Sequence, residues 1–137
     1  MHRTLILVLG LLFLSSCTTF TLAPALPAST TEVNAINVEY GSELDAKKTG
    51  VLDRYKMKDV FIAALRGSFA TGGDTTLQVT ITQFRTGGYG PTRMHAVANL
   101  MDASGAVVKS MEADSTSVMR GVAAVAQEVV NQIGAGL

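Results

Sequence analysis

The sequence predicts a single α+β domain, a two-layer sandwich of order β-α-β-β-β-α with two helices on one face of a mostly antiparallel sheet. Apolar and polar residues alternate over 33–40 and 76–82, which is the period of a half-buried strand. Apolar residues recur at helical spacing over 55–69 and 118–133. The connections between the last three strands are short, which favours antiparallel pairing. A chain of 137 residues fits one domain with an appended segment.

The first part of the domain combines a strand with a helix. The strand is expected at 33–40, where Gly41 and Ser42 stop it. Residues 43–54 mix charges of both signs, so we expect a solvated connection there. A helix then follows from near Tyr55 to Phe69. Its apolar stripe consists of Met57, Val60, Phe61, Ala64, Leu65 and Phe69.

Three further strands and a second helix complete the predicted domain. The strand at 76–82 is the clearest, and the strand at 93–101 places Met94, Ala96, Ala98 and Leu100 on one face. Alanines on that face allow a helix to approach closely. Asp102–Gly105 forms a turn, and the strand 106–113 has no clean alternation. The last helix is expected to carry Val118, Val122, Val125, Ala126, Val129 and Ile133, with an N-cap among 115–117 and a stop at Gly134.

The first residues have the pattern of an export signal. A positive start, Met1-His2-Arg3, precedes the uncharged apolar run 5–14, which is too short to cross a bilayer as a helix. Leu14-Ser15-Ser16-Cys17 resembles the lipobox of bacterial lipoproteins: an apolar residue, two small residues, then cysteine. The alternatives are an uncleaved anchor and an ordinary signal with a chance cysteine.

This resemblance implies three regions. Residues 1–16 are a signal peptide, 17–32 carry the lipidated Cys17 and a flexible tether, and 33–137 form a small periplasmic domain. The Cys17 thiol receives a diacylglyceryl group and the freed amine an acyl chain, which together hold a protein stably on a membrane. Thr18 is not the aspartate that favours inner-membrane retention, so the outer membrane is expected. The alternative to a free tether is that Phe20 and Leu22 dock onto the domain.

Composition excludes several functional classes. Eleven basic residues balance eleven acidic ones, so no basic face for nucleic acid is indicated. One cysteine permits neither an internal disulfide nor a cysteine-based zinc cluster. After cleavage His95 is the single histidine, and no nucleophile motif accompanies it. We therefore expect a non-enzymatic protein without metal or cofactor. The sequence does not exclude one alternative, a pair of carboxylates that cleaves glycosidic bonds.

The glycine-rich segment 85–93 is the most unusual stretch of the domain. It lacks the lysine and following helix of a phosphate-binding loop. One interpretation is a hairpin loop whose glycines adopt unusual φ angles. The other is a contact loop in which Arg85, Tyr89 and Arg93 bind a partner, because tyrosine and arginine are enriched where proteins bind proteins.

The element order is similar to that of small α+β domains in periplasmic lipoproteins, such as transport-auxiliary lipoproteins and outer-membrane assembly accessories. The resemblance covers about residues 33–134 and carries no functional position over. The leading expectation is a membrane-anchored envelope lipoprotein that acts as a binding or assembly module. Its partners are the bilayer, through acylated Cys17, and an envelope protein. The alternative is a carrier of a small ligand or lipid.

Overall fold

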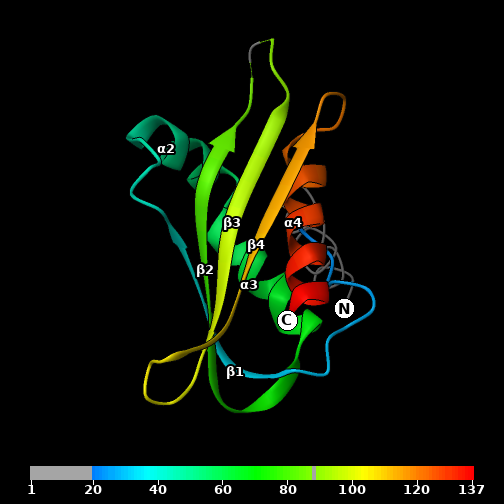
Figure 1. Cartoon of the computed structure of the whole chain (residues 1–137). Coiled ribbons are helices and arrows are strands. Elements are labelled where there is room, and N and C mark those ends of the chain that lie inside the picture. Colours follow the sequence, from blue (N-terminus) through cyan, green and yellow to red (C-terminus); the bar gives the residue numbers. More distant parts are fainter. Residues whose placement is uncertain (1–19, 88) are drawn as a thin grey trace, which may run out of the picture.

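The computed structural model describes residues 20–87 and 89–137. Within them, one four-stranded sheet has the order β1-β2-β3-β4 (Figure 1). Sheet and helices form the α+β sandwich that the sequence predicts. The elements are β1 (Glu32–Tyr40), α2 (Ala46–Arg54), α3 (Met57–Ser68), β2 (Ala70–Arg85), β3 (Thr92–Met101), β4 (Val107–Ser117) and α4 (Val122–Gly136).

The sheet is mixed and mostly antiparallel, as the sequence predicts. β1 pairs with β2 in parallel, and β2–β3 and β3–β4 are antiparallel. A parallel pair needs a long crossover connection, and α2 with α3 provides it between β1 and β2. On the covered face, α3 contacts β1 and β2 while α4 contacts β3 and β4.

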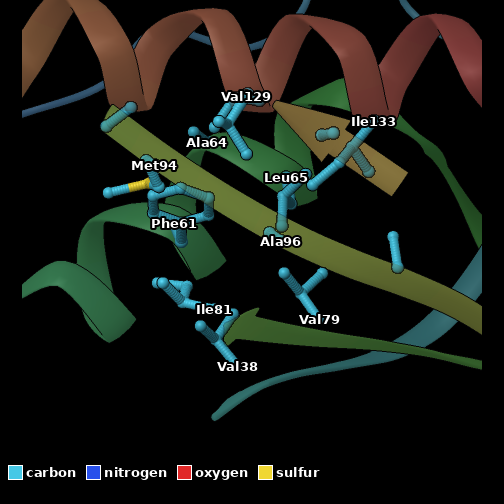
Figure 2. Close-up of a cluster of buried hydrophobic side chains, with 14 of the residues drawn as sticks. Val38, Phe61, Ala64, Leu65, Val79, Ile81, Met94, Ala96, Val129 and Ile133 are labelled. Atoms are coloured by element: carbon cyan, nitrogen blue, oxygen red, sulfur yellow. The ribbon is translucent and has the colours of Figure 1, made fainter. Parts of the chain in front are cut away.

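The core lies between the sheet and these two helices. Phe61 and Leu65 from α3 meet Val129 and Ile133 from α4 over β2 and β3 (Figure 2). None of these four side chains reaches solvent. The small side chains of Ala96 and Ala98 on β3 leave room for the helices, as the sequence predicts. The stripe of α3 is confirmed apart from Val60, which is only partly buried.

The expectation of a solvated connection over 43–54 is wrong, because residues 46–54 form α2. The Asp45 carboxylate caps this helix by accepting a hydrogen bond from the Lys48 N–H at 2.9 Å. Leu52 is the helix's single buried residue. A short helix with one buried side chain leaves almost no apolar periodicity, so the charges dominated the sequence pattern.

Both predicted ends of the last helix are also wrong. α4 begins at Val122, after Gly121, and Val118 is 87% exposed in the preceding loop. The Ser117 hydroxyl accepts a hydrogen bond from the Arg120 N–H at 2.9 Å and so stabilises that loop instead of capping the helix. Gly134 does not stop α4. It is buried inside the helix, where a β-carbon would collide with Ala25.

The described part of the expected tether, residues 20–31, packs against the domain. Ala25 is fully buried, and its N–H donates to the Ser68 hydroxyl of α3 at 2.8 Å. Gln127 of α4 pairs with both backbone groups of Ala23, at 2.7 and 2.8 Å. Phe20 and Leu22 are partly buried against the core, so the alternative of a docked segment is confirmed. The helices provide hydrogen-bond partners for a backbone that would otherwise have none. None of the helices among the described residues is long and apolar enough to cross a membrane.

Candidate contact surface at the β2–β3 hairpin

The glycine-rich segment is the tip of a long hairpin. β2 and β3 extend to Arg85 and Arg93, which are opposite each other in the strand register. Figure 1 shows this hairpin projecting beyond the rest of the sheet. Gly87 has a φ of +80°, which favours glycine. Tyr89 is completely exposed at the tip. The hairpin interpretation is thus confirmed, and the turn leaves the Tyr89 side chain in solvent, while partner contact remains a prediction.

The two arginines of the hairpin differ in what they contact. The Arg93 guanidinium binds Asp114 of β4 through two nitrogens, at 3.1 and 3.2 Å. The hydrogen bond to Asp114, followed by that carboxylate's charge, raises the pKa of Arg93. Arg85 has no ion-pairing carboxylate among the described residues, and its guanidinium lies over Gly90. Of the predicted contact residues, Arg85 and Tyr89 are therefore free to bind a partner, whereas Arg93 is already paired.

A surface groove of about 430 Å³ lies at the base of the hairpin. Lys48 and the two arginines line it, and Glu43 is its one acidic residue. Because Arg93 is paired with Asp114, Arg85 and Lys48 are the cations left against Glu43, and this small positive excess suits an anionic group on a partner. Lys48 comes from α2, the helix that the sequence pattern concealed, so this side of the groove could not be anticipated.

Thr82, His95 and Glu112 lie next to one another on the polar face of the sheet near the hairpin. The Thr82 hydroxyl lies 2.6 Å from His95 Nδ1, and His95 Nε2 lies 3.9 Å from the Glu112 carboxylate. Thr82 sits at a register shift where β2 has one extra residue opposite His95. His95 is on the polar face, as expected. Its partners could not be identified from the sequence, because they belong to different strands.

The predicted lipidation site, Cys17, lies outside the described residues. Among those residues no group of three or more histidine, cysteine, aspartate or glutamate side chains is placed to hold a metal ion.

The fold resembles several solved structures. No family model matches the chain, and no curated protein does. A PelC dodecamer from Paraburkholderia phytofirmans is 20% identical, with a TM-score of 0.55 over 85% of this chain and 95% of that one. A dodecamer of a PelC variant from the same organism is 21% identical, with a TM-score of 0.53 over 82% and 89%. Protein XCC0632 from Xanthomonas campestris, assigned to the family DUF330, is 12% identical, with a TM-score of 0.54 over 85% and 88%. At these identities the likeness concerns the fold alone.

Proposed function

We propose that this protein is a membrane-anchored envelope lipoprotein whose domain acts as a non-enzymatic binding or assembly module. The observation that carries the proposal is the projecting hairpin, which presents Tyr89 and Arg85 without internal partners among the described residues. Exposed tyrosine and arginine side chains are the kind that anchor protein contacts. The filled core behind the sheet makes the domain a rigid support for that hairpin.

The anchor is supported by the lipobox-like Leu14-Ser15-Ser16-Cys17. Acyl chains on Cys17 hold the domain at a bilayer, and Thr18 after the cysteine favours the outer membrane. Confinement near a surface raises the effective concentration of a partner in the same envelope. A weak contact through the hairpin is then sufficient for function.

The carrier alternative receives less support from the packing. A carrier needs an apolar cavity of several hundred cubic ångströms between sheet and helices. That space is filled by side chains such as Phe61, Leu65 and Ile133, none of which is exposed (Figure 2). A domain packed in this way offers its surface rather than its interior to a ligand.

A second copy of this chain is the first partner to test. The PelC structures that share the fold are dodecamers. Native mass spectrometry of the detergent-solubilised full-length protein measures whether this chain also self-associates. A purely monomeric protein directs the search to another envelope protein.

The anchor is tested by replacing Cys17 with serine. We expect the wild-type protein to begin at Cys17 with a lipid adduct in intact-mass spectrometry, and to sediment with membranes. Cys17→Ser removes the adduct and leaves the protein as a soluble or an unprocessed form that still carries residues 1–16. Ser15→Ala keeps the pattern of one apolar and two small residues before the cysteine, so it serves as the matched control with normal lipidation. A wild-type protein without lipid mass contradicts the proposal.

A further inference from the structure

An apolar groove lies where the chain enters the described fold. It has a volume of about 440 Å³ and is lined by Phe20, Leu22, Tyr55 and Val60 among others. The Phe20 ring meets the Tyr55 ring edge to face, with centroids 5.3 Å apart. Tyr55 remains 37% exposed in the link between α2 and α3. The groove therefore presents aromatic and aliphatic surface on the outside of the molecule.

The position of Phe20 limits how far this groove can lie from the proposed anchor. Gln127 holds the backbone of Ala23, so the segment is attached to α4 close to the groove. Cys17 precedes Phe20 by three residues, a span of at most about 10 Å even when fully extended. A free tether over 18–31 would have let the domain turn in any direction, but the docked segment removes that freedom.

The rim of the groove has the chemistry of a membrane-contacting surface. Arg54 and Lys56 are exposed and line it, together with one carboxylate, Asp59. Lys58 does not line the groove, and its ammonium lies over the Tyr40 ring, 4.4 Å from the centroid. Basic residues next to a bilayer are attracted to anionic headgroups, and tyrosine favours the interface between acyl chains and water.

We propose that the face formed by Phe20, Tyr55, Arg54 and Lys56 rests in the headgroup layer of the bilayer that holds Cys17. This inference rests on the proposed lipidation and adds an orientation to it. The α2–α3 link then lies at the membrane. The turn between β3 and β4, which Figure 1 places at the other end of the sheet from α2, points away from it.

Tryptophan fluorescence tests this orientation directly, because the sequence contains no tryptophan. Tyr55→Trp introduces a single fluorophore at the groove. Val107→Trp introduces one at the β3–β4 turn, on a side chain that is 53% exposed. Each lipidated full-length variant is reconstituted into vesicles of phosphatidylethanolamine and phosphatidylglycerol, with or without brominated acyl chains. We expect bromination to reduce the emission of Tyr55→Trp by half or more and to leave that of Val107→Trp nearly unchanged.

Two further variants keep the result interpretable. Thr21→Trp, at an exposed residue of the same groove, replaces Tyr55→Trp if that variant has a lowered Tm. Arg54→Glu combined with Lys56→Glu, added to Tyr55→Trp, is expected to weaken the quenching. Equal quenching at both ends of the sheet, or none at the groove of a lipidated protein, overturns the orientation alone. Absence of a lipid adduct from the intact mass overturns the proposed function, and this inference with it.

Discussion

Ser68 has an unusual position for a polar side chain. Among the described residues it is the one polar or charged residue that is fully buried. Its hydroxyl donates to the Ala64 carbonyl at 2.7 Å and accepts from the Ala25 N–H at 2.8 Å. Its own carbonyl accepts from the Ser29 N–H at 2.8 Å. One residue at the end of α3 thus connects the N-terminal segment to the domain.

Ser68→Ala is therefore expected to weaken both stability and docking. The change leaves the buried Ala25 N–H without a partner, which costs about 1–3 kcal/mol of unfolding free energy. Urea denaturation measures this loss, and limited proteolysis of residues 20–31 measures how firmly the segment is held. Ser42→Ala, at an exposed turn residue, is the control and should stay within about 0.5 kcal/mol of wild type. Unchanged stability and proteolysis would show that the segment is held by other contacts.

At the scale of elements, β4 depends on its turn and on a glutamine of α4. Gln132 pairs with both backbone groups of Asp114, at 2.9 and 2.8 Å, on the open edge of the sheet. A strand edge with paired backbone groups is a poorer template for pairing with a strand of another chain.

In the turn between β3 and β4, Gly105 has a φ of +86°, and the Asp102 carboxylate accepts hydrogen bonds from Ser104 and Ala106. The Ser104 hydroxyl is the main cause that lowers the pKa of Asp102, followed by the Ala106 N–H.

This shift predicts a pH dependence of stability. A carboxyl group with a lower pKa in the folded state stabilises the fold above its unfolded pKa of about 3.9. The contribution is lost as the pH falls through the folded pKa. Asp102→Asn cannot ionise, so the stability difference from wild type should be largest near neutral pH and shrink below about pH 4. Urea denaturation from pH 7 to pH 2.5 measures it, and a constant difference across that range contradicts the assignment to ionised Asp102.

For the whole molecule, the hairpin should be separable from the stability of the domain. Tyr89 and Arg85 are exposed, so Tyr89→Ala with Arg85→Ala should leave the Tm nearly unchanged. The same pair should strongly reduce the cross-linking of the protein to its partner in cells. The matched control is Val108→Ala with Lys109→Ala, two exposed residues of β4 near the β3–β4 turn. If every cross-link survives the hairpin pair, the contact surface lies elsewhere on the domain.

Local sequence patterns are sufficient to predict β1, the centre of β2, the α3 helix and the buried face of β3, whereas β4 has no clean alternation. Each of these features depends on the period with which apolar and polar residues alternate in one segment. This period can be read from the sequence of that segment alone. Leu77, Val79 and Ile81 are fully buried for this reason, as are Met94, Ala96 and Ala98. The candidate loop 85–93 was also found locally, because its glycines and its tyrosine are neighbours in the chain.

Which polar groups become partners depends on how the chain folds in three dimensions. Ala23 bonds to Gln127, 104 residues away, and this contact converts an expected tether into a docked segment. Asp114 forms an ion pair with Arg93, although the two residues are 21 positions apart in the sequence. The α2 helix brings Lys48 to the base of the hairpin. A polar group accepts any suitable partner that reaches it, so composition and spacing do not identify that partner. The pairing is settled only when the sheet and helices bring distant segments together and the buried backbone must be satisfied.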